Sequence, residues 1–530
     1  MATSLTLGAS GADVNPLLVE STAPHGAPQF TQITNEHYKP AFEQAVREAR
    51  ADIAAIVGNA QAPTFANTIE ALEFSGRRLD RISNIFFNLN EAHTNDTMQA
   101  LALELSPMLT EFSNDVSLDP KLFARVKAVY DRRELLGLNA EQRRLLEKTY
   151  KGFARSGAAL SDGDKKIYRE LTARLSELSL QFNQNSLAAT NAFTLHVTDP
   201  AVVGELPDFV REGMAAEAKE RGLDGWVVTL QIPSMIPFMT YSSNRALKEK
   251  LWRAYNTRCV GGEFDNSAIV EEIADKRLQL AGLLGYETYA DYVLEERMAE
   301  SSPTVNAFLA ELLDRAVEAA RRDVETVAGY ARGQGFDAEL MPWDFGYYSE
   351  KLKHERYELS EELTKPYFQL ENVRRGMFEL ANRLYGITLR ENPEIPVYHP
   401  DVKAYEVFDA DGSFLAVLYM DFFPRASKRG GAWMTEFRQQ GVENGVETRP
   451  LISVVYNFTK PTDSLPSLLT FDEVTTMLHE FGHALHGIFA AGTSISSKCR
   501  RRSWRTGPTR RNFSTCSRSI TVRARRCPPS

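Results

Sequence analysis

Two histidines and a glutamate in one short run constrain the local fold of this chain most strongly. Residues 479–483 read His-Glu-Phe-Gly-His. In an α-helix, His479 and His483 lie one turn apart on the same face, so both imidazoles can reach one zinc ion. Glu480, the next residue along, can then hold and deprotonate a water molecule. The alternative is a core helix with two partly buried histidines, and the flanking residues favour the metal site.

Those flanking residues predict that the run lies on a helix. Thr470 and Glu473 form a capping-box pattern, and Asp472 with Glu473 would occupy the first turn, where the helix dipole favours acids. His486 would lie on nearly the same face as His479, either as a partner of a zinc ligand or as a histidine packed under the site. Apolar residues recur at helical spacing, at Val474, Met477, Leu478, Phe481, Leu485 and Ile488.

The size and composition of the chain predict a soluble globular protein with at least two domains. Its 530 residues exceed a single hydrophobic core, and 43% hydrophobic, 25% charged and 10% aromatic residues are ordinary values. No apolar run approaches a membrane span, and the first residues lack the basic start and apolar stretch of a signal peptide. We therefore expect a cytoplasmic monomer, with a periplasmic location as the alternative.

Charge and cysteine content divide the chain into two unlike parts. From residue 498 onward there are one lysine and ten arginines and no acid, which contributes +11 to a total of −9. The first 497 residues therefore carry −20. Cys259 stands alone in that acidic body, and the other three cysteines lie in the tail, so a disulfide framework is not expected.

Helical periodicity dominates from about residue 38 to residue 333. It predicts helices over residues 38–60, 162–187 and 302–333, the second of them capped by Ser161. The last helix is expected to run through Phe308, Leu312, Ala316 and Val324, which recur at helical spacing.

Strand patterns are fewer and lie late in the chain. Residues 402–408 and 414–420 flank Asp411 and Gly412, which predicts a hairpin. Residues 451–458 predict a strand shortly before the zinc helix. Such a strand can either offer an exposed edge that holds an extended peptide by main-chain hydrogen bonds, or lie buried as an ordinary strand.

Several segments resemble the thimet oligopeptidase family of zinc peptidases. The likeness covers roughly residues 14–497. Residues 483–490 lean toward the peptidyl-dipeptidase (dipeptidyl carboxypeptidase) branch of the family rather than toward its oligopeptidase A branch. The segments that carry the likeness are Asn15–Leu17, Glu36–Phe42, Tyr419–Pro424, Lys428–Met434 and Pro450–Gly487.

The resemblance implies a mainly α fold, a two-domain helical clamshell with a small β element beside the zinc helix. Enzymes of this kind cleave short, unstructured peptides in a deep channel that excludes folded proteins. The resemblance also implies that His479 and His483 ligate one zinc ion per chain and that Glu480 is the general base. The peptidyl-dipeptidase branch removes C-terminal dipeptides, and an endo-acting, oligopeptidase A-like enzyme is the alternative.

These patterns divide the chain into four expected parts. Residues 1–25 are expected to form a flexible N-terminal arm, with the first 13 disordered. Residues 26–240 are expected to form an N-terminal helical domain and residues 241–490 an incomplete zinc peptidase domain. Residues 491–530 are expected to be a disordered, out-of-frame basic tail.

The family pattern breaks after the histidine motif. The resemblance implies a third zinc ligand, a glutamate on a following helix, and tyrosines and histidines beyond it that bind substrate. No Asp or Glu follows Glu480 in this sequence, and no histidine follows His486. We therefore expect zinc to be held weakly and peptidase activity to be small or absent.

A shifted reading frame explains the unusual tail. If codons for Ser503–Pro528 are regrouped one base earlier, permitted codons give an acidic, amphipathic sequence similar to the family's sequence after its third ligand. A codon's second base largely sets polarity class, so free choice of third bases would hardly produce this pattern. We hypothesise a frameshift, real or introduced in sequencing, between about residues 492 and 499.

Two other interpretations of the tail compete with this one. Its arginine clusters could bind nucleic acid or an acidic partner, but its aromatic residues are only Trp504 and Phe513 and no nucleic-acid fold is visible. The chain could also be an inactive helical scaffold with a basic tail. The favoured interpretation has short unstructured peptides as partners and neither nucleic acid nor membrane.

Overall fold

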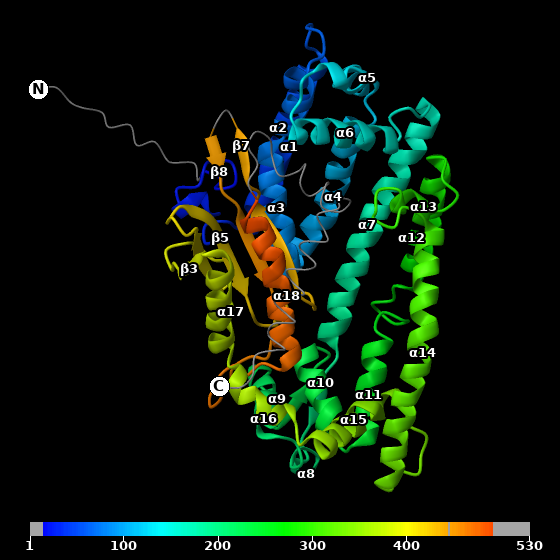
Figure 1. Cartoon of the computed structure of the whole chain (residues 1–530), viewed down its shortest axis with the longest axis vertical. Coiled ribbons are helices and arrows are strands. Elements are labelled where there is room, and N and C mark those ends of the chain that lie inside the picture. Colours follow the sequence, from blue (N-terminus) through cyan, green and yellow to red (C-terminus); the bar gives the residue numbers. More distant parts are fainter. Residues whose placement is uncertain (1–13, 444–445, 491–530) are drawn as a thin grey trace, which may run out of the picture.

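The chain folds into long helices around a small central sheet (Figure 1). The computed structural model describes residues 14–443 and 446–490. The expected disorder of residues 1–13 and the expected tail from residue 491 lie outside the described residues. The predicted fold class, mainly α with a small β element beside the helix that carries residues 479–483, is confirmed.

The helices in the first half of the chain are α1 (Asn35–Val57), α2 (Ala71–Phe74), α3 (Arg77–Ala92), α4 (Asp96–Ser117), α5 (Pro120–Tyr130), α6 (Ala140–Arg155), α7 (Asp162–Ala192), α8 (Pro200–Val203), α9 (Asp208–Glu220), α10 (Ile232–Tyr241) and α11 (Arg245–Asn256). The later helices are α12 (Ser267–Leu283), α13 (Tyr289–Leu294), α14 (Ser302–Gly333), α15 (Pro342–Tyr357), α16 (Glu361–Thr364), α17 (Leu370–Tyr385) and α18 (Phe471–Ile488). The strands are β1 (Leu195–Val197), β2 (Trp226–Val228), β3 (Thr388–Glu391), β4 (Val402–Phe408), β5 (Phe414–Asp421), β6 (Trp433–Arg438), β7 (Gly441–Glu443), β8 (Val446–Thr448) and β9 (Leu451–Val455).

The three predicted helices are present as α1, α7 and α14. The apolar residues Phe308, Leu312 and Val324, whose spacing predicted α14, keep 61%, 48% and 49% of their surface exposed. The helix packs chiefly against α15 and less against α13, and its buried residues are Val327 and Ala331. No helix within the described ranges combines the length and apolarity that crossing a membrane requires.

The central sheet has five strands in the order β3-β4-β5-β9-β6. The predicted hairpin is present as β4 and β5, and β9 lies parallel to β5 and antiparallel to β6. Of the two possibilities for residues 451–458, the exposed edge is wrong, because β9 is flanked on both sides and all its residues are buried. The sheet edge nearest α18 is β6 instead.

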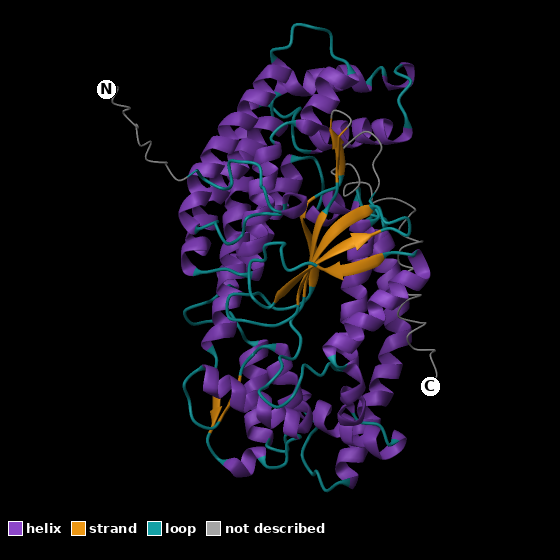
Figure 2. Cartoon of the chain, turned by 90° about the vertical axis from the view of Figure 1, so that its left-hand side faces the viewer, coloured by secondary structure: helices purple, strands orange, loops and turns teal. Residues whose placement is uncertain are grey.

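Helices cover both faces of this sheet (Figure 2). Neighbouring residues of β5 point to opposite faces, so Val417 and Tyr419 join the core with α1, α3 and α4. Leu418 and Met420 join the core with α17 and α18. A central strand buried on both faces reads as a continuous apolar run rather than as an alternating one, and β5 has that pattern.

The packing bears on the expected division of the chain. Leu17 is 2% exposed and Asn15 donates a 2.8 Å hydrogen bond to the carbonyl of His37, whereas Val14 and Val19 are exposed, so the flexible arm expected over residues 1–25 stays a prediction. One hydrophobic core joins α1, α3 and α4 to the sheet, across the expected boundary at residue 240. A separate core under β1 and β2 includes α9, α10 and α11, at the bottom of Figure 1. The boundary stays a prediction.

Candidate metal centre

The helix that carries the histidine motif begins where the sequence predicts. The Thr470 hydroxyl accepts a hydrogen bond from the backbone N–H of Glu473 (3.1 Å), and the Glu473 carboxylate accepts one from the N–H of Thr470 (2.7 Å). Glu473 also accepts from the N–H of Thr459 (2.7 Å), in the loop after β9. Burial raises the pKa of Glu473 despite these bonds, so the first turn of α18 is held by a carboxylate largely removed from water.

One face of α18 packs tightly on the sheet. A side chain at Gly487 would place its Cβ 2.7 Å from Cδ1 of Ile452 and 2.9 Å from Cε of Met434, so the helix approaches β9 and β6 as closely as a glycine permits. The predicted apolar residues are all buried, and they are Val474, Met477, Leu478, Phe481, Leu485 and Ile488. This packing fixes which face of α18 is left for His479 and His483.

The two histidines project from the exposed face of α18 and converge. The Nε2 atoms of His479 and His483 lie 3.2 Å apart, and the two ring centroids lie 4.8 Å apart with the planes nearly perpendicular. Two nitrogen ligands at Zn–N distances near 2.05 Å around a tetrahedral ion are about 3.3 Å apart. The observed separation therefore fits two ligands of one zinc ion.

Glu480 differs from its histidine neighbours in being buried. It is 8% exposed, and burial raises its pKa while nearby His479 acts in the opposite direction. It accepts no hydrogen bond from any described residue. Tyr456, the residue after β9, is fully buried and donates its hydroxyl to the carbonyl of Met477 (3.3 Å), and its pKa is raised by burial and by Glu480. Glu480 is thus a desolvated carboxylate beside the histidine pair.

The described part of the chain brings no third protein ligand to this pair. Within residues 14–443 and 446–490, no group of three or more His, Cys, Asp or Glu side chains is arranged to hold a metal ion. His486 is only partly exposed, on the helix turn that follows His483, which leaves both of its predicted roles open. The described residues therefore fit two of the three ligands that a catalytic zinc ion takes.

Sequence reasoning missed a buried charge cluster at the end of β5. Asp421 is fully buried and forms ion pairs with Arg425 (2.6 Å) and Lys428 (2.9 Å), and Tyr398 donates its hydroxyl to it (2.8 Å). Burial alone would raise the pKa of Asp421, but the two cations hold it below its ordinary value. Burial lowers the pKa of Lys428 to about 8. The sequence feature that could have indicated this cluster is Asp421 itself, an acid between the apolar residues of β5 and Phe422.

This cluster and one asparagine position the strands beside α18. Lys428 also donates to the carbonyl of Tyr456 (2.7 Å), and Arg425 donates to the carbonyl of Ala92 at the end of α3. The side-chain amide of Asn457 donates to the carbonyls of Arg429 (3.0 Å) and Gly431 (2.6 Å), in the turn that leads into β6. Contacts of the segments that follow β5 and β9 therefore fix the position of β6, the edge strand next to the histidine motif.

The chain is similar to known peptidases along most of its length. The model of peptidase family M3 matches residues 238–499. A dipeptidyl carboxypeptidase of Escherichia coli (strain K12) is 42% identical over 480 residues, which cover 90% of this chain and 70% of that protein. An oligopeptidase A of the same organism is 35% identical over 478 residues, which cover 89% of this chain and 70% of that protein.

Two solved structures are also similar, at 15% sequence identity. A putative oligoendopeptidase F has a TM-score of 0.47 over 86% of this chain and 64% of its own. A PZ peptidase A with an inhibitor has a TM-score of 0.47 over 88% of this chain and 66% of its own. The chain spans about two thirds of the length of these two structures.

Proposed function

Since the chain belongs to peptidase family M3, a family of zinc metallopeptidases, we propose that His479 and His483 are two of its zinc ligands and Glu480 its general base. The observation that carries this proposal is the pair of Nε2 atoms 3.2 Å apart beside a buried carboxylate without a hydrogen-bond donor among the described residues. The reaction is hydrolysis of a peptide bond in a short, unstructured peptide.

The chemistry divides between the metal and the protein. A bound zinc ion supplies a Lewis acid that polarises the scissile carbonyl and lowers the pKa of water. Glu480 accepts the proton of the attacking water and passes it to the leaving amine, a general-base role worth about 10²–10⁴ in rate. Burial supports this role, because a raised pKa makes the carboxylate a better proton acceptor.

We propose that the chain as written is an impaired member of the family. Zinc at a catalytic site takes three protein ligands, whereas the described residues supply two. The sequence has no Asp or Glu after Glu480 and no histidine after His486. A two-histidine site should release zinc readily, so turnover should be slow or absent unless a further ligand is supplied.

The mode of cleavage is the finer part of the proposal. The dipeptidyl carboxypeptidase relative at 42% identity favours release of C-terminal dipeptides. The oligopeptidase A relative at 35% identity supports internal cleavage as the alternative. A cytoplasmic location, a monomeric state and a domain boundary near residue 240 belong to the same proposal.

A peptide digest followed by mass spectrometry tests this function. The purified chain is incubated with excess zinc and an octapeptide that is acetylated at its N-terminus and free at its C-terminus. The matched variant Glu480→Gln keeps the shape of the side chain and removes the base. We expect a slow release of C-terminal dipeptides that the variant lacks. Equal cleavage by the variant would contradict the role of Glu480. Hydrolysis at a rate usual for family enzymes would contradict the proposed impairment.

A further inference from the structure

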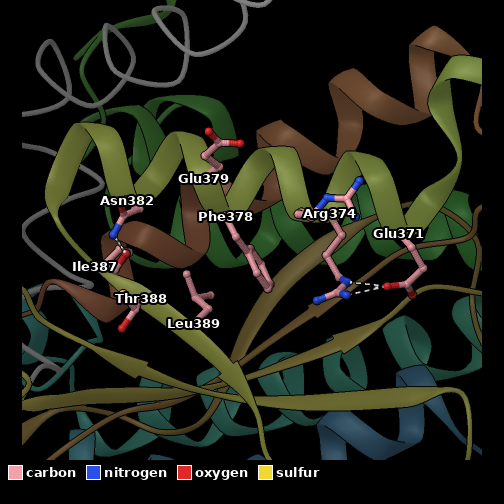
Figure 3. Close-up of a pocket in the computed structure, with 9 residues that line it drawn as sticks. Glu371, Arg374, Phe378, Glu379, Asn382, Ile387, Thr388 and Leu389 are labelled. Carbon is pink, nitrogen blue, oxygen red and sulfur yellow. Dashed lines mark hydrogen bonds and ion pairs between the residues drawn. The ribbon is translucent and has the colours of Figure 1, made fainter.

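A cleft of about 520 Å³ lies between α17 and β3, at the opposite margin of the sheet from β6 (Figure 3). One wall is a single face of α17, since its lining residues between Glu371 and Asn382 recur at helical spacing. The other wall is formed by residues 387–389, where the chain enters β3. The volume is within the range of ligand sites, and neither His479 nor His483 lines it.

The strand that borders this cleft has an unpaired side. β3 pairs with β4 along one side, and no strand in the described ranges pairs with the other. Figure 1 places β3 at the outer margin of the molecule. The N–H and C=O groups of such an edge are a template for one more strand, so an extended peptide can bind here by main-chain hydrogen bonds.

Every charged residue that lines the cleft, except Arg375, forms an ion pair with a described residue. The two glutamates that line it, Glu371 and Glu379, each form an ion pair with a neighbouring arginine. Arg375 has no carboxylate partner among the described residues, and its exposed guanidinium donates to Oδ1 of Asn372 (2.8 Å). A guanidinium without a counter-ion pairs well with a carboxylate, so the cleft favours an acidic ligand.

Apolar surface lies next to this cation. In Figure 3 Phe378 points from α17 toward β3, and Leu389 points from β3 toward α17. The guanidinium of Arg374 lies 5.3 Å from the centre of the Phe378 ring and is already paired with Glu371. Alternate side chains of a strand point to the same side. An added strand can therefore place an apolar side chain on Phe378 and an acidic one, two residues away, on Arg375.

From these four features we infer that the cleft is a second peptide-binding site, separate from the metal centre. It takes an extended segment that adds to β3 as a strand and carries an acidic residue two positions from an apolar one. The acidic side chain binds Arg375, and the apolar side chain lies between Phe378 and Leu389. The ring of Phe378 also contacts Phe481 on the buried face of α18 (6.2 Å between centroids). The bound peptide is therefore separated from the exposed histidine face of α18 by the helix itself.

Fluorescence anisotropy with a labelled peptide tests this inference. The probe is fluorescein-Thr-Asp-Thr-Val-Thr-amide, and the full chain is kept in EDTA so that no hydrolysis occurs. We expect saturable binding that Arg375→Gln weakens by about tenfold, the effect of losing one charge-assisted hydrogen bond. Arg356→Gln is the control, because Arg356 is exposed at the end of α15 and does not line the cleft. It should leave the affinity unchanged.

Two further measurements separate this site from other binding. Replacing Asp by Lys in the probe should abolish binding, and bound probe should slow hydrogen exchange of the β3 amides, residues 388–391. Absence of saturable binding would overturn the inference. So would affinity unaffected by Arg375→Gln, or protection confined to β6 and α18, which would place the peptide at the metal centre.

Discussion

The backbone N–H of Thr459 donates a 2.7 Å hydrogen bond to the carboxylate of Glu473, so the loop after β9 is tied to the first turn of α18. The same carboxylate accepts from the N–H of Thr470 and thereby caps the helix. One side chain therefore sets both the start of α18 and its position on the sheet. The exposed face that carries His479 and His483 depends on this anchor.

Replacing Glu473 should destabilise the protein clearly. Glu473→Ala leaves the N–H groups of Thr459 and Thr470 without their acceptor, and we expect the free energy of unfolding to fall by about 2 kcal/mol. Asp472→Ala is the matched control, because Asp472 is exposed in the same turn, and it should cost about 0.3 kcal/mol. Urea denaturation followed by circular dichroism measures both. Equal losses would show that the capping bonds contribute little.

The buried charge cluster predicts a larger effect. Asp421→Asn leaves Arg425 and Lys428 buried without their counter-charge, and breaking such a cluster costs about 3–5 kcal/mol. The exposed pair of Glu379 and Arg383 supplies the comparison, since Glu379→Gln should cost less than about 1 kcal/mol. If the two variants unfold at the same urea concentration, the cluster does not hold the end of β5 as described.

Two neighbouring histidines predict how stability depends on pH. The rings of His93 and His399 have centroids 5.2 Å apart, and burial together with the charge of Arg425 lowers both pKa values below 6.5. The unfolded chain therefore binds more protons than the folded one below pH 6.5, so stability is lost as pH falls from there toward the folded-state pKa values.

Thermal melts between pH 7.5 and 5 measure this dependence. The double variant His93→Gln, His399→Gln should lose less stability over that range than the original chain. Asp421 does not confuse the comparison, because its pKa lies below 3.8 and its own contribution is lost only in stronger acid. An unchanged pH slope in the double variant would contradict the assignment.

The reading frame near the end of the family match gives a genetic prediction. The family M3 model matches up to residue 499, and the hypothesised shift lies between about residues 492 and 499. We expect resequencing to find one base gained or lost there, and a gene with the frame restored to encode a much more active zinc peptidase. An intact frame through residue 530 would refute the hypothesis.

Local sequence patterns predicted much of this structure. The capping box at Thr470 and the spacing of apolar residues placed α18, and the Asp411-Gly412 turn placed the hairpin of β4 and β5. These signals depend on residues a few positions apart. They also predicted which side chains of α18 would be buried, which left the histidine pair on the exposed face.

Long-range packing was not predictable in the same way. The apolar run of β9 is equally suited to an edge or a centre, and its partners β5 and β6 decide between them. Periodicity marks an apolar face on α14 but cannot say whether another element covers it. The ion pairs of Asp421 depend on how the segment after β5 folds back, which no local spacing encodes.

Isothermal titration with zinc tests the central claim most directly. The claim is that His479 and His483, with Nε2 atoms 3.2 Å apart, bind one metal ion together. We predict one weak zinc site per chain, which Glu480→Gln retains and the double variant His479→Ala, His483→Ala loses. Dialysis should lower the zinc content of the original chain to well below one ion per chain. Unchanged zinc binding in the double variant would contradict the claim.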